Sequence, residues 1–140
     1  MDVIDLSTLI LEVQTSLSDL PDYYATDEQI YFDLKIAYAY VARVASSDWT
    51  DMDFAGHVIA RLGAYLTYMN YTSLAEKKLG EVPTSMQIKI EAMRRIVVMM
   101  LRLMSNMKIN DDLTIDDQSL LKAHTAGMVV MPTALYGNRY

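Results

Sequence analysis

Histidine is the usual acid–base group at neutral pH, and the sequence contains only two, His57 and His124. Each falls in a segment predicted to be helical, and neither has a second histidine at the spacing of metal ligands. Cysteine is absent, which excludes disulfides, thiolate metal sites and a cysteine nucleophile. We therefore interpret both histidines as structural.

A run of acidic residues at Asp111, Asp112, Asp116 and Asp117 invites comparison with a calcium-binding loop. An EF-hand loop that began at Asp112 would need glycine at its sixth place and glutamate at its twelfth. This sequence has Asp117 and Ala123 there. The spacing argues against calcium, and we expect these side chains to cap a helix and a solvated turn.

No other arrangement of residues indicates catalysis. The five glycines are isolated, so there is neither a Gly-x-Ser-x-Gly turn nor a glycine loop that could cradle a phosphate. The sequence therefore predicts a protein that is not an enzyme, with no metal and no cofactor. An enzyme whose carboxylates and His57 meet only in the fold stays a third possibility, because helical bundles can assemble sites from distant positions.

Methionine and tyrosine are the unusual residue types, with eleven and ten copies. Methionine is flexible and polarizable, so it can either fill a core or form a binding surface, and tyrosine supplies rigid amphipathic area that interfaces favour. The predicted partner-interface residues are Tyr31, Tyr38, Tyr68 and Tyr71 on helices, and Met128, Val129, Val130, Met131, Pro132, Leu135, Tyr136 and Tyr140 near the C-terminal end.

The composition predicts one soluble domain with a packed core, because 52% of the residues are hydrophobic and 21% are charged. Acidic residues at the N-terminus argue against a secretory signal. The longest apolar run, residues 96–101, is far shorter than the ~20 residues of a membrane span. A net charge of −6 without a basic stripe argues against partners such as nucleic acid or a membrane surface.

Apolar residues at helical spacing predict an all-α fold. We expect helices over about residues 3–18, 26–46, 50–79 and 86–107. Pro21 ends the first, Thr26 and Gln29 form a capping box at the start of the second, and Gly80 is a C-cap signal for the third. Trp49, in the turn between the second and third helices, is predicted to be a packing anchor.

The fourth predicted helix has the most regular pattern. Its heptad seam consists of Met86, Ile90, Met93, Val97, Met100, Met104 and Met107, and a helical partner must cover it. Apolar residues beyond the seam are Ile88, Ile96, Leu101 and Leu103. These predict that the helix is covered on more than one side, and we place it at the centre of the bundle.

The predicted architecture is a four-to-five-helix bundle with a long central helix and an extended C-terminal arm. Residues 1–109 form the bundle domain, and residues 110–140 form a short helix, about 116–124, followed by the arm that is used in assembly. From residue 127 onward the chain has one charged side chain, so it is too apolar for a solvated tail, and its glycines and proline disfavour a helix.

Several segments between residues 20 and 85, taken in their order along the chain, resemble the head–tail connector (adaptor) proteins of tailed phages. The likeness rests on the capped start Ala25-Thr26-Asp27-Glu28, the turn Ser47-Asp48-Trp49, a long helix with His57, Leu62 and Tyr65, and the segment Ala75-Glu76-Lys77-Lys78 with the connector Leu79-Gly80-Glu81-Val82-Pro83-Thr84-Ser85. It spans about residues 20–85. Pro83, followed at once by a long helix, leaves little room for the strand or hairpin that is often found there in the family.

The resemblance implies a ring of identical subunits, about twelve, that joins the portal protein to a neck or tail protein. It implies a place in the virion neck after assembly in the host cytoplasm, and a C-terminal arm that inserts into a neighbouring protein. A portal-side adaptor and a tail-side stopper or completion protein both fit. The alternative is a small cytoplasmic helical interaction or regulatory module whose Met/Tyr face grips a partner helix.

Overall fold

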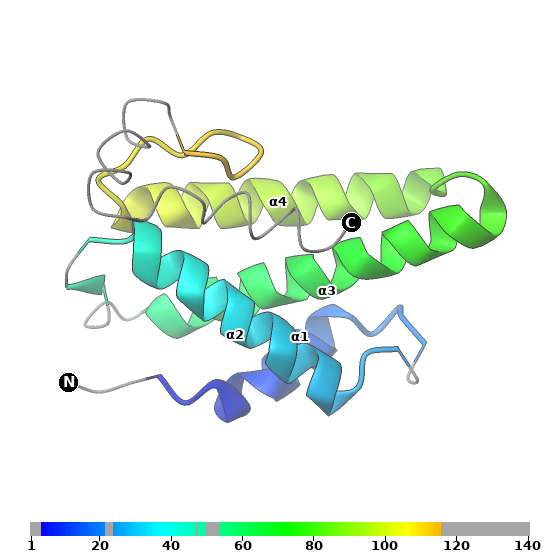
Figure 1. Ribbon diagram of the computed structural model, residues 1–140, viewed down its shortest axis with the longest axis horizontal. Helices are drawn as coiled ribbons and strands as arrows, with labels where there is room; N and C mark the ends of the chain where they lie inside the picture. Colours follow the sequence, from blue (N-terminus) through cyan, green and yellow to red (C-terminus); the bar gives the residue numbers. More distant parts are fainter. Residues whose placement is uncertain (1–3, 22–23, 47, 50–53, 116–140) are drawn as a thin grey trace.

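The computed structural model describes residues 4–21, 24–46, 48–49 and 54–115. Its elements are a short 3-10 helix η1 (Leu6–Leu9), then α1 (Ile10–Ser16), α2 (Asp27–Val44), α3 (Ala55–Leu79) and α4 (Thr84–Met104), as Figure 1 shows. Within these ranges the only β-type pairing is an isolated bridge between Ile109 and Ile115. The all-α prediction is confirmed. The helix predicted over 116–124 and the arm lie outside the described residues.

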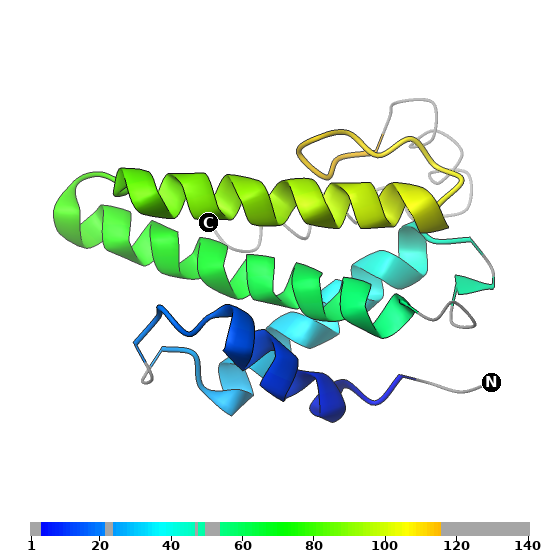
Figure 2. The same cartoon turned by 180° about the vertical axis from the view of Figure 1, so that it is seen from behind.

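The central helix of the bundle is α3. It packs against α2, α4, α1 and η1, and Figures 1 and 2 show it between α4 on one side and α1 with the first half of α2 on the other. Its residues are buried around most of the circumference between Ala55 and Thr72. Small residues such as Gly63 let neighbours approach closely, since a Cβ there would lie 2.8 Å from Leu34 Cδ2.

The prediction that the Met-rich helix lies at the centre is wrong, because α4 packs mainly against α3 and forms an edge of the bundle. A helix that is apolar all round is typical of a core, whereas a regular one-sided seam is typical of an edge. The seam itself is covered as predicted. Val97 and Met104 are buried, and Met86, Ile90, Met93 and Met100 pack against the same core from partly exposed positions; Met107, also packed there, lies beyond the helix end.

The helix-terminal predictions are confirmed in most respects. Thr26 Oγ1 accepts a hydrogen bond from the Gln29 N–H at 3.2 Å, so Thr26 is the N-cap of α2. Gln29 Nε2, however, donates to Asp33 Oδ2 at 3.0 Å and not back to Thr26, so the return half of the capping box is absent. Gly80 ends α3 with a left-handed φ of 83°, as expected of a C-cap.

The C-terminal ends of α2 and α4 are tied together. The Ser46 N–H donates to the Met104 carbonyl at 2.8 Å, and Ser105 Oγ donates to the Val44 carbonyl. Nearby, Trp49 is buried and its ring lies edge-on to Tyr38, with 5.5 Å between ring centroids. Trp49 is therefore the packing anchor that the sequence predicted.

The loop after α4 folds back onto the bundle and becomes part of its core. Ile109, Leu113 and Ile115 are buried in the same cluster as the helices, and the Tyr40 hydroxyl donates to the Leu113 carbonyl. The predicted boundary between residues 109 and 110 falls inside this loop, so the bundle extends at least to Ile115. The buried residues of this loop are irregularly spaced, so neither a helical nor a strand period in the sequence indicated that the loop belongs to the core.

Candidate interaction surface

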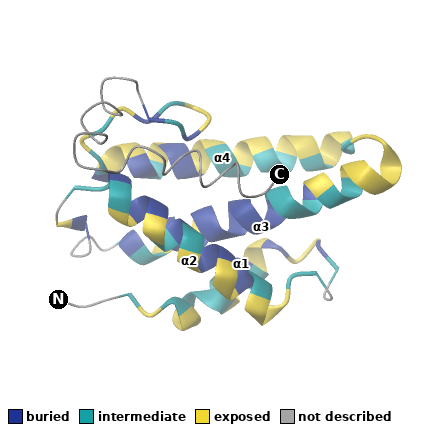
Figure 3. Ribbon diagram, viewed as in Figure 1, coloured by how far each residue is buried: buried dark blue, intermediate teal, exposed yellow. Residues whose placement is uncertain are grey.

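A second apolar stripe runs along α4, about 120° around the helix from the seam. It consists of Ile88, Ala92, Ile96, Met99 and Leu103, and the four large side chains are 66%, 39%, 61% and 73% exposed. At 100° per residue these positions span only about 80° of the helix and about 22 Å of its length. Figure 3 shows exposed positions along α4. We call this set the outer stripe.

The outer stripe differs from ordinary surface hydrophobics. Single exposed apolar residues are normal, but a continuous row on one helix marks a contact surface. The steps of four, three and four between Ala92, Ile96, Met99 and Leu103 have the spacing of a helical packing seam. Within the described chain nothing covers this row, so its apolar surface is available to another element.

Basic side chains flank the outer stripe. Four basic residues and one acidic residue lie on α4. Arg95 Nη2 pairs with Glu91 Oε1 at 2.7 Å, and Arg102 Nη2 pairs with Asp111 Oδ1 at 3.1 Å. The Arg95 and Arg102 side chains are 74% and 50% exposed, so the carboxylates of a partner could also reach their guanidinium groups.

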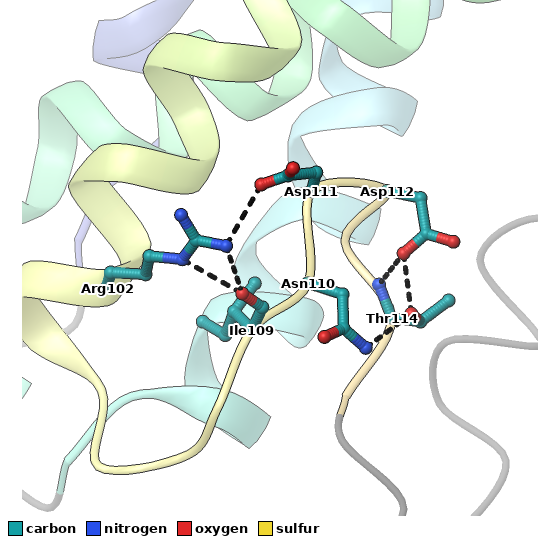
Figure 4. Close-up of polar contacts among 6 residues, drawn as sticks. All are labelled: Arg102, Ile109, Asn110, Asp111, Asp112 and Thr114. Atoms are coloured by element: carbon teal, nitrogen blue, oxygen red, sulfur yellow. Dashed lines mark hydrogen bonds and ion pairs between the residues drawn. The ribbon is translucent and has the colours of Figure 1, made fainter.

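Arg102 also shapes the surface by holding the loop after α4. Its Nε and Nη2 donate to the Ile109 carbonyl at 2.9 and 2.7 Å, as Figure 4 shows. In the same loop, Asp112 accepts from the N–H and the hydroxyl of Thr114 at 3.1 and 2.5 Å. These hydrogen bonds, aided by the charge of Arg94, hold the pKa of Asp112 below its usual range. Asp112 thus stabilises a turn, as predicted for the acidic run.

At the other end of α4, Lys89 fastens the helix to the turn after α1. Lys89 Nζ contacts Asp19 Oδ1 at 2.5 Å and the Ser16 carbonyl at 3.2 Å, and it lies 4.9 Å from the Tyr68 ring centroid. The Tyr68 hydroxyl donates to Asp19 Oδ2 at 3.2 Å. Burial acts to raise the pKa of Asp19, but the hydrogen bond and the charge of Lys89 outweigh it, so the pKa of Asp19 is lowered. Burial and the Asp19 charge raise the pKa of Tyr68 to about 12. The Tyr68 hydroxyl therefore stays protonated and holds Asp19 through its hydrogen bond.

A groove of about 220 Å³ separates α1 from α4 and has α3 as its floor. Figure 2 shows α1 and α4 on the two sides of α3. The groove is lined by Ser16, Arg61, Ala64, Lys89, Met93 and Ile96. Because Ile96 belongs to both, the groove continues the outer stripe around the edge of the bundle.

The structure separates the tyrosines that were predicted to contact a partner. Tyr31 is exposed on α2. Tyr38 is half-buried against Trp49, and Tyr71 is half-buried with its ring 5.0 Å from that of Tyr24. Tyr68 is only 2% exposed, so its assignment to a partner interface is wrong. Tyrosine is amphipathic, so its presence in a helix does not show whether it lies on the buried or the exposed side.

The remaining predicted interface residues, Met128, Val129, Val130, Met131, Pro132, Leu135, Tyr136 and Tyr140, lie outside the described residues, as does His124. His57 is exposed on α3, where its Nδ1 lies 2.9 Å from Glu12 Oε2 of α1. This contact joins α1 and α3. Across residues 4–115, apart from the gaps, no cluster of three or more His, Asp or Glu side chains could hold a metal ion.

None of the helices in the described part of the chain is both long and apolar enough to cross a membrane. Comparison of the sequence and structure with protein-family models, curated proteins and solved structures finds no match in any of the three.

Proposed function

We propose that this chain is a structural assembly subunit, the head–tail connector (adaptor) of a tailed phage. Identical copies form a ring, about twelve by the family resemblance, between the portal protein and a neck or tail protein. The observation that supports the proposal best is the outer stripe of α4, an apolar row left open on a bundle whose core is otherwise closed.

The energetics of the stripe favour a permanent contact. Burying a large aliphatic side chain stabilises a complex by about 1.5–3 kcal/mol before association costs are subtracted. Ile88, Met99 and Leu103 offer most of their surface for this purpose. The basic flank adds orientation, because charged groups at the rim select a partner of opposite charge and fix its register.

In this proposal the segment after Ile115 contributes to assembly. The described chain ends beside the C-terminal half of α4, where Arg102 holds the Ile109 carbonyl and Ile109 pairs with Ile115. A further 25 residues follow, and those from 127 onward are almost uncharged. In this proposal they form an arm that inserts into a neighbouring protein, with Met128–Met131, Leu135 and Tyr136 as its apolar contacts.

The proposal assigns the protein to the virion neck, after assembly in the host cytoplasm, and gives it no catalytic role. The test is negative-stain imaging of the purified protein, alone and mixed with portal assemblies of the same phage. We expect rings, or a ring-shaped layer on the portal. A compact monomer under both conditions would rule out the connector role.

The groove between α1 and α4 favours a second candidate, a small helical module that binds a helix of one cellular protein. Its lining is apolar at Ala64, Met93 and Ile96 and basic at Arg61 and Lys89, which suits an amphipathic acidic helix. A defined one-to-one complex with a single cellular protein, and no ring, would favour this module over the connector.

A further inference from the structure

The charges of this chain are divided between two edges of the bundle. Among the described residues before Lys35, Asp5, Asp27 and Glu28 are exposed, Glu12 is partly exposed, and there is no lysine or arginine. Two further carboxylates do not count toward this edge, because Asp19 is paired with Lys89 of α4 and Asp33 is buried. Lys35, the first basic residue, lies 5.3 Å from the Tyr31 ring centroid. The edge helix α4 contains four basic residues and one acidic residue. A net charge of −6 for the chain hides this division, because it averages two surfaces of opposite sign.

The acidic edge also carries exposed apolar side chains. We define the acidic edge as α1 with the first half of α2, where Leu11 is 73% exposed, Phe32 is 55% exposed and Tyr31 is 40% exposed. Glu28, one turn before Phe32, is exposed beside them. Apolar area with an acidic rim is the complement of the outer stripe, which is apolar with a basic rim.

The two surfaces lie on opposite sides of the molecule. Figures 1 and 2 both show α4 along one edge and α1 with the start of α2 along the other, with α3 between them. The helices α2 and α4 each turn their buried side toward α3. Their exposed sides therefore face away from each other, so a single copy cannot bring them together.

From this arrangement we infer that copies of this chain associate head to tail, with the outer stripe of one copy docked on the acidic edge of the next. This inference rests on the proposed assembly function and names its subunit contact. Two different surfaces on opposite edges make a heterologous interface, which propagates from copy to copy and closes only as a ring. Leu11 and Phe32 contact Met99 and Leu103 in this interface.

The alternative pairing of two outer stripes is disfavoured by charge. It would place the arginines of one α4 against those of the other, and like charges face to face oppose association. It would also close at two copies, because the same surface serves both partners. Head-to-tail docking brings Arg95 toward carboxylates and leaves a free surface at each end.

Two variants test the inference by complementation. Leu103→Glu blocks the outer stripe, and Phe32→Glu blocks the acidic edge; both residues are exposed, so circular dichroism should show unchanged helicity. Leu79→Glu is the matched control, because Leu79 is 66% exposed at the tip of α3, away from both surfaces. Sedimentation velocity over a wide concentration range is measured for each chain alone and for the mixture.

The inference predicts that each blocked variant is monomeric alone, while the two mixed together form a one-to-one dimer through their two intact surfaces. Leu79→Glu should associate like the parent. Raising the salt from about 50 to about 500 mM should weaken the association, since the contact pairs opposite charges.

Other results overturn the inference in identifiable ways. If Phe32→Glu alone still forms dimers, the outer stripes pair with each other. If both variants assemble like the parent, or if the parent is monomeric at every concentration, the two surfaces do not bind each other. These outcomes would not decide the connector proposal. If the parent chain forms rings on portal assemblies, that proposal stands although the two surfaces do not bind each other.

Discussion

The Thr67 hydroxyl in α3 donates a hydrogen bond to the Asp33 carboxylate in α2 at 2.6 Å, and neither side chain has exposed surface. Gln29 Nε2 donates to the same carboxylate oxygen. Asp33 is thus a buried polar group at the most extensive helix contact in the bundle. Such a group fixes how two helices align, because sliding would leave it without donors.

Thr67→Val tests this role, since it keeps the shape of the side chain and removes the donor. We expect the free energy of unfolding in urea to fall by about 1–3 kcal/mol, because the buried carboxylate loses one of its hydrogen-bond donors while Gln29 still donates to it. Thr15→Val on the exposed side of α1 is the control and should have little effect. Equal effects of the two substitutions would contradict the structural role of Asp33.

The two sides of α4 should respond very differently to a charge. Val97 is 1% exposed on the seam, and Val97→Asp should unfold the domain, because an unpaired buried charge costs several kcal/mol. Leu103→Asp, six residues away on the outer stripe, should change the stability of the monomer by no more than about 0.5 kcal/mol. Thermal melts at low protein concentration compare the stability of the two variants. Loss of the fold in both would show that α4 is covered on two sides within one chain.

Acid should weaken the link between Asp19 and Lys89. Lys89 holds the pKa of Asp19 in the folded chain below its usual range, so the ion pair contributes stability above the unfolded pKa and loses it as the pH falls through the folded pKa. Asp19→Asn should therefore cost less than about 1 kcal/mol at neutral pH, because the pair is partly exposed. The difference in free energy of unfolding between parent and variant should narrow as the pH falls below about 5 and close once the pH is below the folded pKa of Asp19. A gap that does not change with pH would argue against the ion pair.

Truncations separate the bundle from the arm. Deleting residues 127–140 should leave the melting temperature of the monomer nearly unchanged and weaken assembly, because the arm lacks a core periodicity. Ending the chain after Ile109 should instead destabilise the bundle by about 4 kcal/mol or more, since Leu113 and Ile115 leave the core and the buried Tyr40 hydroxyl loses its acceptor. A large drop in melting temperature for the first truncation would contradict the division.

The helices were predictable because their signals are local. The Thr26 N-cap, the Gly80 C-cap and the seam of α4 each follow from a few neighbouring residues, and the structure places them as expected. No local signal in the sequence showed which helix lies at the centre of the bundle. Small residues such as Gly63 let α2 cross α3 closely, and this close approach places α3 at the centre. The spacing of apolar residues does not reveal such an approach.

The candidate surface was only partly predictable. The apolar residues Ile88, Ile96 and Leu103 were visible as an excess beyond the seam, whereas Tyr68 was placed on the wrong side of its helix. The turn at Asp112 was predicted, but the packing of the loop after α4 into the core was not. Leu113 has a left-handed φ of 71° and is fully buried, a combination that only the surrounding packing can impose on a leucine.

The central claim is that this chain assembles with copies of itself, and its most direct test is the mass of the purified protein in solution. Light scattering over a concentration series, with Leu103→Glu in parallel, measures it. The account predicts that the mass of the parent chain rises well above 15.9 kDa and that the variant stays close to that value. A parent chain that remains at 15.9 kDa at every concentration, with or without portal assemblies, would contradict the account.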